Sequence, residues 1–364
     1  MMGAEKSQRS RPTRVSYRNY QLIRLFPSTQ NQITELRELR DSEPEDIKFW
    51  TPPISNRWVS LCEKIFSTQY LEYLAFKYPR MVELITIGHS YEGQPIKMVK
   101  ISTGLNKEGE VKPAIWIDAG MHAREWIGSA VATYILSQLV ERNTTYSRLL
   151  DTSDWMILPV ANPDGYEFSH IADRLWRKTR SRHFEQQDEA SGCEGVDPNR
   201  NFAFHWGEEK DGGASHDPCH ETYAGPYAFS EPETKAVADF ILANRMYLTL
   251  HSYSQMWLVP WSHSHSKPSD YSELANVARK AISAISKVHG TNYQVGPSSD
   301  MLYTTSGASD DWAKGVAGIK YVYTLELRDR GTYGFLLPAT QIVPTAREVW
   351  AGIRTIARLV TCNT

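Results

Sequence analysis

The stretch AIWIDAGMHAREWIGSA, residues 114–130, decides the fold class of this chain. Its apolar first part predicts a buried strand over residues 113–119, and its last part begins a helical pattern over residues 125–141. Alternation of such strands and helices is typical of a parallel or mixed sheet that is covered by helices. We therefore expect an α/β fold in which His122 and Glu125 lie where a strand ends and a helix opens.

The alternation continues on both sides of this stretch. Apolar runs predict further strands at residues 83–87, 96–102, 155–160, 247–252 and 321–327. Helical patterns lie between or after them at residues 67–78, 231–243, 271–287 and 344–360. A chain of 364 residues is long enough for one large α/β domain of this kind with a small appendage.

A smaller unit precedes the large domain. Residues 17–27 predict a short strand, residues 29–40 a helix, and DIKFWTPP at residues 46–53 a second strand closed by prolines. This β-α-β fragment is too small to bury a good core alone. Because the composition changes just after it, we divide the chain into a small N-terminal region, 1–54, and a large domain, 55–364.

The overall charge of the chain points to no general class of partner. Forty Lys and Arg face 42 Asp and Glu, which gives a formal net charge of -2. We therefore expect neither nucleic acid nor a membrane surface as a partner. No apolar run approaches the roughly 18 residues that span a bilayer, and the start, MMGAEKSQRSRPTRV, lacks the apolar stretch of an export signal. No long heptad pattern is present, so we expect a monomer.

The chain has four cysteines, and the sequence alone allows three full pairings of them. Cys193 and Cys219 bracket a loop rich in Gly, Asp and His, which a cross-link would restrain. We predict that these two are bonded, while two free thiols remain the alternative. The pairing of Cys62 and Cys362 is left open.

His122 and Glu125 are candidate ligands of a metal ion. At positions i and i+3 their side chains share a face, so an imidazole nitrogen and a carboxylate can converge on one cation at about 2.0–2.2 Å. One such His-x-x-Glu match is expected by chance in a chain with 11 His. His251, which ends the apolar run YLTLHS, is the candidate third ligand, and its alternative is a hydrogen-bonded core histidine. The histidines of two polar loops are predicted to lie on the surface: His216, His220, His263 and His265.

Several longer motifs resemble one known family. MHAREW at 121–126, DPNRN at 197–201, HSYSQ at 251–255 and TLELRDRGTYGFLLPA at 324–339 are similar, in this order and spacing, to the zinc metallocarboxypeptidases of the pancreatic A/B type. The resemblance covers roughly residues 67–360. It implies a single domain with a mixed, twisted eight-stranded sheet flanked by helices. It also implies one Zn²⁺ per chain, held by His122, Glu125 and His251, with an open position for water.

The resemblance assigns catalytic roles to residues that, taken alone, would be interpreted as structural. Glu326 matches the carboxylate that takes a proton from water and returns it to the leaving amine, although pairing with Arg328 or another cation for stability is the alternative. Arg177 matches the residue that stabilises the oxyanion. Asn199 and Arg200 match the pair that binds the terminal carboxylate of a substrate, although DPNRN alone reads as a surface turn.

The remaining site residues concern the substrate. Arg124 matches an auxiliary substrate-binding arginine, and Tyr303 matches a mobile tyrosine that closes over the terminal residue. Asp310 occupies the position at the base of the specificity pocket, where a buried carboxylate favours a basic side chain. Asp197 is expected to orient His122 as a hydrogen-bond acceptor.

Together these residues predict a zinc-dependent exopeptidase that removes C-terminal Lys or Arg, most similar to carboxypeptidase B. Two alternatives stay open: an enzyme that removes apolar C-terminal residues, and a catalytically silent relative that acts as a binding module. The implied partners are peptide or protein C-termini, its own propeptide and proteinaceous inhibitors. Residues 1–54 resemble only the first portion of the family's propeptide and are predicted not to form a complete inhibitory lid. The family also implies secretion.

Overall fold

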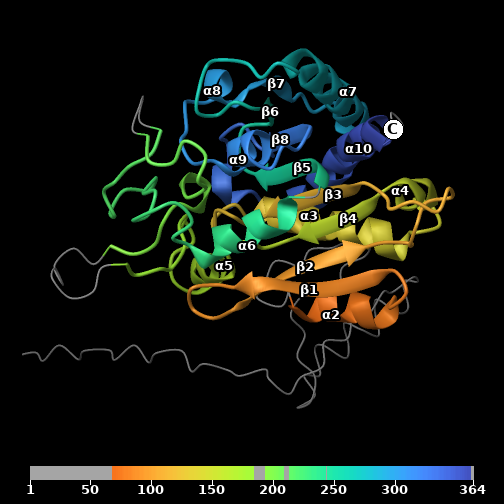
Figure 1. The fold of residues 1–364 in the computed structure, drawn as a ribbon, viewed down its shortest axis with the longest axis horizontal. Coiled ribbons are helices and arrows are strands. Elements are labelled where there is room, and N and C mark those ends of the chain that lie inside the picture. Colours follow the sequence, from red (N-terminus) through yellow and green to blue (C-terminus); the bar gives the residue numbers. More distant parts are fainter. Residues whose placement is uncertain (1–67, 184–192, 209–212, 243, 362–364) are drawn as a thin grey trace, which may run out of the picture. The chain divides into compact units, whose positions relative to one another are not determined.

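The computed structural model describes residues 68–183, 193–208, 213–242 and 244–361 (Figure 1). The strands and helix predicted in the N-terminal region and the boundary after residue 54 lie outside these residues, as do Cys62 and Cys362.

The strands of the described chain form one mixed sheet of eight, in the order β1-β2-β4-β3-β5-β8-β6-β7 (Figure 1). Their bounds are β1 (Val82–His89), β2 (Pro95–Ile101), β3 (Ala114–Ala119), β4 (Asp154–Leu158), β5 (Asn244–His251), β6 (Met256–Val259), β7 (Gln294–Pro297) and β8 (Tyr321–Glu326). The central strands β4, β3, β5 and β8 are parallel to one another, while β1 pairs antiparallel with β2, β2 with β4, and β6 with β8. The predicted α/β fold with a mixed eight-stranded sheet is confirmed.

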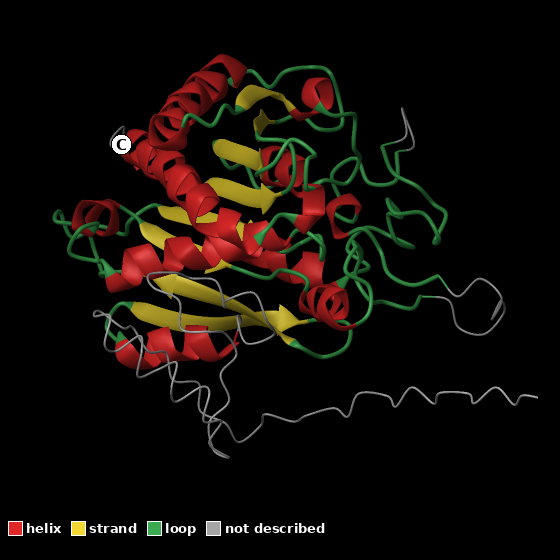
Figure 2. Ribbon diagram, turned by 180° about the vertical axis from the view of Figure 1, so that it is seen from behind, coloured by secondary structure: helices red, strands yellow, loops and turns green. Residues whose placement is uncertain are grey.

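Helices flank both faces of this sheet (Figures 1 and 2). Their bounds are α2 (Thr68–Lys77), α3 (Trp126–Glu141), α4 (Ser147–Thr152), α5 (Pro163–Ile171), α6 (Pro232–Ile241), α7 (Tyr271–His289), α8 (Ser298–Met301), α9 (Ser309–Gly315) and α10 (Ile342–Thr361). Apolar residues of α2, α3, α4, α7 and α10 form one core with the sheet, and those of α6 and α9 form a second core on its other face. The sheet therefore separates two cores.

Strand β3 explains why the central apolar runs are nearly continuous. Ile115 and Ile117 pack into the core that contains α3 and α10, whereas Trp116 between them packs into the core that contains α6 and α9. All three side chains are fully buried. A parallel strand covered on both faces needs apolar residues at most positions, which the alternating pattern of a half-exposed strand does not provide.

The structure contains short elements that periodicity did not predict. Strands β6 and β7 have four residues each, and β7 reads QVGP, whose Gly and Pro are poor strand formers. Helix α5 was also missed, although its start carries a recognisable signal. Asn162 caps it by accepting a hydrogen bond from the Gly165 N–H, and Pro163 occupies the first helical position.

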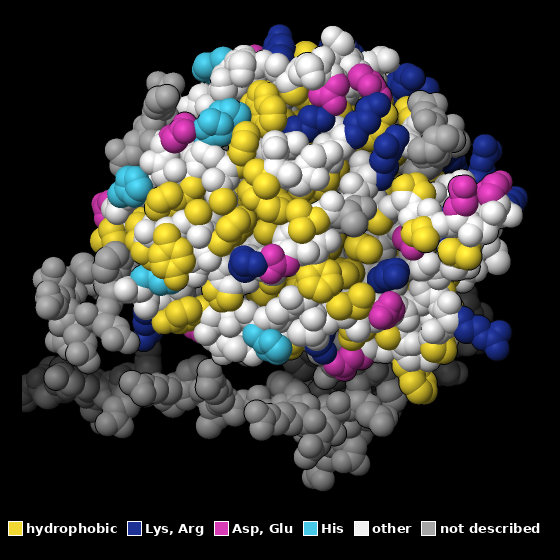
Figure 3. Space-filling view, viewed as in Figure 1, with side chains coloured by type: hydrophobic (Ala, Val, Ile, Leu, Met, Phe, Trp, Pro, Cys, Tyr) yellow, Lys and Arg dark blue, Asp and Glu magenta, His cyan; other side chains and the backbone are white. Residues whose placement is uncertain are grey.

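Two further predictions concern the chain as a whole. Cys193 and Cys219 are bonded, with Cα atoms 5.0 Å apart, which confirms the predicted disulfide. None of the described helices is long and apolar enough to cross a membrane. On the face drawn in Figure 3, positive and negative side chains are interspersed, and no area of a single sign dominates it.

Lys112, just before β3, is a fully buried cation that joins three segments. Its Nζ donates to the Leu150 carbonyl at 2.7 Å and to Thr103 Oγ1 at 2.9 Å, and lies 3.0 Å from Asp154 Oδ1. A buried charge of this kind is tolerated because its partners replace the lost water. Lys112 therefore fixes the start of β3 against α4 and β4.

The Lys112→Met substitution is expected to lower the free energy of unfolding by about 3 kcal/mol, because it leaves Asp154 and the Leu150 carbonyl without their cation. Urea unfolding followed by tryptophan fluorescence measures this. The matched control is Lys235→Met, which breaks a pair with Asp239 whose side chains are 55% and 57% exposed and should cost less than about 0.5 kcal/mol. Equal costs in the two variants would contradict the structural role of Lys112.

Candidate active site

The candidate site lies where the neighbouring parallel strands β3, β5 and β8 end at the same edge of the sheet. His251 and Glu326 are the last residues of β5 and β8 and face each other in register, while β3 leads into the loop that carries His122 and Glu125. This edge is where α/β sheets build binding sites. A cavity of about 310 Å³ opens there. Its lining includes every residue expected at the site: His122, Arg124, Glu125, Arg177, Asn199, Arg200, His251, Tyr303, Asp310 and Glu326.

A glycine allows α3 to start close to β5. A Cβ atom on Gly128 would lie 2.8 Å from the backbone oxygen of Leu250, which is closer than side-chain carbons approach a carbonyl. Because this position has no side chain, the first turn of α3 packs directly against the end of β5. The contact brings Glu125, which precedes the helix, beside His251, which ends the strand.

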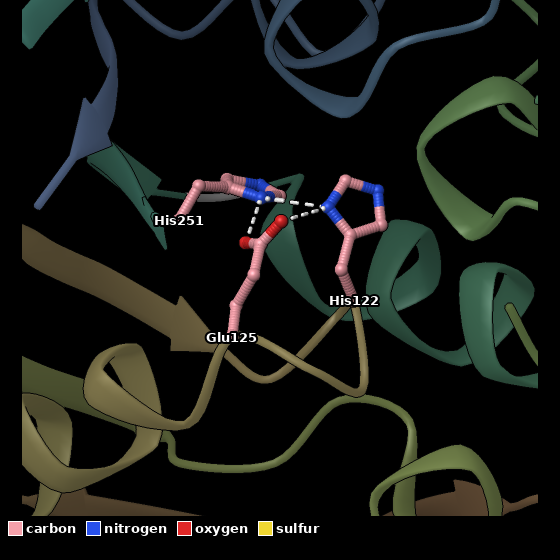
Figure 4. Close-up of side chains that lie close together, drawn as sticks. All are labelled: His122, Glu125 and His251. Atoms are coloured by element: carbon pink, nitrogen blue, oxygen red, sulfur yellow. Dashed lines mark hydrogen bonds and ion pairs between the residues drawn. The ribbon is translucent and has the colours of Figure 1, made fainter. Parts of the chain in front are cut away.

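His122, Glu125 and His251 point at one another in the buried floor of the cavity (Figure 4). The Nδ1 atoms of the two histidines are 3.1 Å apart. Each also lies close to one Glu125 oxygen, at 2.8 Å for His122 and 2.9 Å for His251. Within the described residues, these three side chains form a cluster of the kind that could hold a metal ion, with at least three His, Cys, Asp or Glu groups close together.

The hydrogen bonds of the histidines favour a cation at the centre of this group. The Nε2 of His122 donates to Asp197 Oδ1 at 3.1 Å, so its Nδ1 carries a lone pair that points at the other two side chains. His251 likewise contacts Thr249 Oγ1 through Nε2, at 3.1 Å, and turns Nδ1 inward. Lone pairs and a carboxylate that converge repel one another unless a cation lies between them. Ligand atoms on a tetrahedral zinc are about 3.3 Å apart, so the donor set fits zinc.

Asp197 accepts more hydrogen bonds than any purely orienting role requires. Besides His122, it accepts two from Arg177, whose Nε and Nη2 lie 3.0 and 2.7 Å from Oδ2, and one from the Asn199 N–H at 2.9 Å. Burial by itself would raise the pKa of Asp197, but Arg177, Arg200 and His122 hold it well below its usual range. Asp197 therefore stays ionised, as expected for a residue that orients His122.

Glu326 lines the cavity and is partly buried, close to Glu125 and His251. Its burial, together with the charge of Glu125, raises the pKa of Glu326 to about 8. A metal ion at the neighbouring ligands would act in the opposite direction, because a positive charge favours the ionised carboxylate. The alternative pairing with Arg328 is not what the structure contains: Arg328 binds Glu348, with its Nε 2.7 Å from Oε1.

The expected carboxylate-binding residues form a second part of the cavity. Arg200 is 2% exposed, and its Nε donates to the Gly213 carbonyl at 2.6 Å, which fixes the guanidinium. The Asn199 side chain accepts a hydrogen bond from the Ser309 N–H at 2.9 Å. Tyr303, by contrast, is 51% exposed, with its ring 6.0 Å from the Arg200 guanidinium. A fixed arginine thus lies beside an aromatic side chain at the open mouth of the cavity.

Arg124 lies on the rim of the same cavity. Its Nη1 donates to Glu221 at 2.8 Å, and its guanidinium packs over the Phe335 ring at 4.5 Å. The DPNRN motif is not the exposed turn that its composition suggests, because Asp197 and Arg200 are buried.

Asp310 is a buried residue that lines the cavity. Its Oδ2 accepts hydrogen bonds from Ser262 Oγ at 2.9 Å and Thr324 Oγ1 at 3.1 Å, while Ser298 Oγ lies 3.4 Å away. Burial and the charge of Asp311 raise the pKa of Asp310 to about 6. No Lys or Arg in the part of the chain that the structure describes forms an ion pair with it.

One of the loop histidines differs from its prediction. His216, His220 and His265 are exposed, as predicted. His263 is not a surface residue: its side chain is 13% exposed and its Nδ1 lies 2.6 Å from Asp311 Oδ2. The sequence SHSHSKPSD gives no sign of this contact, because Asp311 is distant in the chain and His265 has the same neighbours.

The fold and the site together define a metal-dependent hydrolase. Three neighbouring parallel strands bring two histidines and a glutamate to one point, with a further carboxylate and several arginines around it. A metal with three protein ligands and a free position is the arrangement of catalytic zinc sites, whereas structural zinc is enclosed by four.

Comparison with known proteins names the family. A model of the zinc carboxypeptidase family matches residues 67–352. Carboxypeptidase B of Astacus astacus is 45% identical over 307 residues, which cover 83% of this chain and 98% of that protein. Carboxypeptidase A2 of Rattus norvegicus is 40% identical over 359 residues, which cover 94% of this chain and 82% of that protein.

Solved structures of similar proteins support the same family assignment. Bovine thrombin-activatable fibrinolysis inhibitor in complex with tick carboxypeptidase inhibitor superimposes with a TM-score of 0.73 at 43% identity, covering 81% of this chain and 95% of that one. Carboxypeptidase A from Helicoverpa armigera gives a TM-score of 0.77 at 30% identity, covering 92% and 80%. The chain belongs to the zinc carboxypeptidase family. It is a metallocarboxypeptidase with zinc as its cofactor.

The His251→Gln substitution is expected to reduce bound zinc from about one to less than about 0.1 per chain, because an amide oxygen replaces the imidazole nitrogen that completes the ligand set. Atomic emission spectroscopy after gel filtration in zinc-free buffer measures the ratio. His220→Gln changes an exposed histidine outside the cavity and should keep the parent ratio. Retention of zinc by His251→Gln would contradict the assignment of this ligand.

Proposed function

We propose that this chain removes the C-terminal residue of peptides and proteins with a preference for Lys or Arg. Removal of a C-terminal residue is the activity of the family to which the chain belongs. The observation that carries the finer preference is Asp310, a buried carboxylate that lines the cavity without a cation among the described residues. The following paragraphs give what supports each part of the proposal.

A basic side chain is the natural occupant of the pocket around Asp310. An ionised carboxylate removed from water is costly unless a cation meets it, and a Lys or Arg side chain of the substrate supplies that cation. The hydroxyls of Ser262, Ser298 and Thr324 surround the carboxylate, and Thr305 also lines the cavity. These small polar groups leave room for a long side chain and can accept its remaining N–H groups.

Selection for chain ends falls to Arg200 and Asn199. A planar guanidinium can make two parallel hydrogen bonds to a carboxylate, and the bond from its Nε to Gly213 holds Arg200 in one orientation. The Asn199 amide is held in the same way by the Ser309 N–H. Arg124 on the rim adds a further positive charge for the substrate, and the exposed Tyr303 can turn toward the bound terminal residue without disturbing the core.

Peptide hydrolysis needs a proton carrier and stabilisation of negative charge. Zinc held by His122, Glu125 and His251 would supply a Lewis acid that polarises the scissile carbonyl and makes an attacking water more acidic. Glu326 takes a proton from that water as its oxygen bonds to the carbonyl carbon, and returns it to the nitrogen as the C–N bond breaks. Arg177, fixed by Asp197, offers the N–H groups not used in that pair to the oxygen that gains negative charge.

Two alternatives remain distinct from this proposal. A-type relatives are about as similar to this chain as B-type ones, so overall similarity does not distinguish the two preferences, and the support for the basic one is the acidic residue at 310. A silent binding module is disfavoured because the zinc-binding side chains, Glu326 and the arginines are all present around one cavity.

The remaining proposals concern partners, location and the N-terminal region. We infer that proteinaceous inhibitors bind the cavity mouth, since the bovine relative is seen with such an inhibitor. The disulfide supports an extracellular location. We assign 1–54 to a partial activation-peptide-like region and 55–364 to the catalytic domain, because the rat match covers 94% of this chain and so reaches ahead of residue 67. Latency of the full chain that trypsin relieves would contradict the expectation that residues 1–54 do not form a complete inhibitory lid.

The Glu326→Gln substitution tests the catalytic proposal. It should lower kcat by about 10²–10⁴-fold while bound zinc stays at the parent ratio, because the amide cannot accept the proton of water. Peptides ending in Arg serve as substrates, and a parent sample treated with a zinc chelator gives the metal-free rate. Activity that survives chelation, or a Glu326→Gln variant as fast as the parent, would rule out this mechanism.

The Asp310→Asn substitution tests the preference. It should lower kcat/KM for a peptide ending in Arg by about a hundredfold, since the charged partner of the guanidinium is lost, and change that for a peptide ending in Phe by less than about threefold. Asp300→Asn, which alters an exposed carboxylate paired with His265, is the matched control. A parent enzyme that releases Phe faster than Arg would refute the basic preference outright.

A further inference from the structure

Behind the specificity pocket, Asp311 joins two segments that are far apart in the chain. Its Oδ1 accepts a hydrogen bond from the Ser262 N–H at 2.8 Å, and its Oδ2 accepts one from the His263 N–H at 2.8 Å. The same Oδ2 accepts a third from His263 Nδ1 at 2.6 Å. A carboxylate oxygen can only accept, so His263 carries its proton on Nδ1. The loop after β6 is thereby fastened to helix α9.

This connection determines where one wall of the pocket lies. Ser262, whose backbone N–H binds Asp311, also donates a hydrogen bond from its Oγ to Asp310 at 2.9 Å. Asp310 in turn accepts the Asp311 N–H at 2.9 Å. Neither His263 nor Asp311 lines the cavity. His263 and Asp311 therefore position the Ser262 hydroxyl although neither of them contacts the substrate.

The ring of His263 is held on several sides. It stacks on His205 with ring centres 3.9 Å apart and planes within 11°, and the ring centres of Phe204 and Trp261 each lie 5.3 Å away with their planes steeply inclined to it. His205 adopts a left-handed backbone conformation with φ of 53°, which is uncommon for a residue other than glycine. Its own Nδ1 lies 2.8 Å from Glu208 Oε1, so this ring is also fixed. A ring so constrained directs Nδ1 at Asp311 and nowhere else.

We propose that His263 is a positioning residue for substrate specificity: its Nδ1–H bond to Asp311 holds the Ser262 loop on α9, so that Ser262 and Asp310 together receive a basic C-terminal side chain. The inference rests on the proposed preference for Lys or Arg. It adds a residue outside the cavity to those that determine the substrate.

Removal of the His263 ring donor is expected to weaken binding because the pocket becomes less ordered, while the charge of the pocket stays the same. Without the ring donor, Asp311 keeps its two backbone donors, which a loop can exchange for water. The Ser262 hydroxyl then samples positions away from Asp310, and the carboxylate meets an incoming guanidinium in a less fixed orientation. Binding of a basic side chain weakens, whereas an apolar terminal residue, which makes no hydrogen bond there, is unaffected. The zinc ligands and Glu326 lie on other segments, so the chemical step is unchanged.

The experiment compares His263→Phe with His263→Asn in the otherwise unchanged chain. Phe keeps the stacking on His205 but has no donor, whereas the Asn amide places an N–H near the position of Nδ1. For a peptide ending in Arg, His263→Phe should raise KM about tenfold with kcat within about twofold, and His263→Asn should stay within about threefold of the parent. For a peptide ending in Phe, both variants should match the parent.

A double-mutant cycle tests whether His263 acts through Ser262. In a Ser262→Ala background, adding His263→Phe should raise KM for the Arg peptide by less than about twofold, because the hydroxyl that His263 positions is already gone. Independent, multiplicative effects would overturn this link. Bound zinc and melting temperature verify folding, and should His263→Phe fail to fold, His263→Ala carries the same comparison.

The outcomes separate this inference from the function on which it rests. A parent that prefers Arg together with an unchanged His263→Phe variant overturns the inference and leaves the basic preference intact. A parent that prefers Phe overturns both. Equal losses in the Phe and Asn variants overturn the role of the ring donor.

Discussion

The hydrogen bonds of Asp197 hold the catalytic part of this protein together. One carboxylate, without exposure to water, accepts hydrogen bonds from the candidate zinc ligand His122, from Arg177 and from the backbone of the DPNRN motif. Its acceptance from His122 Nε2 turns the Nδ1 lone pair toward the metal position, and its charge holds Arg177 at the cavity. Asp197 lies 75 residues from His122 in the chain and 20 from Arg177, and it positions both side chains.

The carboxylates of the site differ because of the cations around them. Burial alone would raise the pKa of each, yet the arginines keep that of Asp197 low, while Asp310, beside Asp311 and without a basic neighbour in the described chain, has a pKa of about 6. The pKa of Glu326, which lies next to Glu125, is raised further, to about 8. The arginines act most strongly on Asp197, which leaves Asp310 and Glu326 to be neutralised by metal, proton or substrate.

Much of the fold could be predicted from the sequence, because the central strands are buried on both faces and read as long apolar runs. The sequence also placed the candidate ligands at strand ends, where α/β sheets build sites, and the family resemblance implied that they share one metal ion. What the sequence could not provide was the set of contacts between distant segments. Strand β7, written QVGP, is defined by its partner β6 and not by its own residues. His263 differs from His265 only in that its loop brings it within reach of Asp311, and no local pattern encodes that distance.

The environment of Asp310 also couples ligand binding to the stability of the whole protein. A carboxylate enclosed among hydroxyls is a local strain on the folded state while the cavity is empty, and a cation that enters relieves it. With the proposed preference for Lys or Arg, the residue released in each turnover carries that cation and is itself a stabilising ligand. In a mixture of peptides, the enzyme molecules whose pocket is occupied therefore resist heat and proteolysis longest. Resistance to degradation then measures how often the pocket is filled.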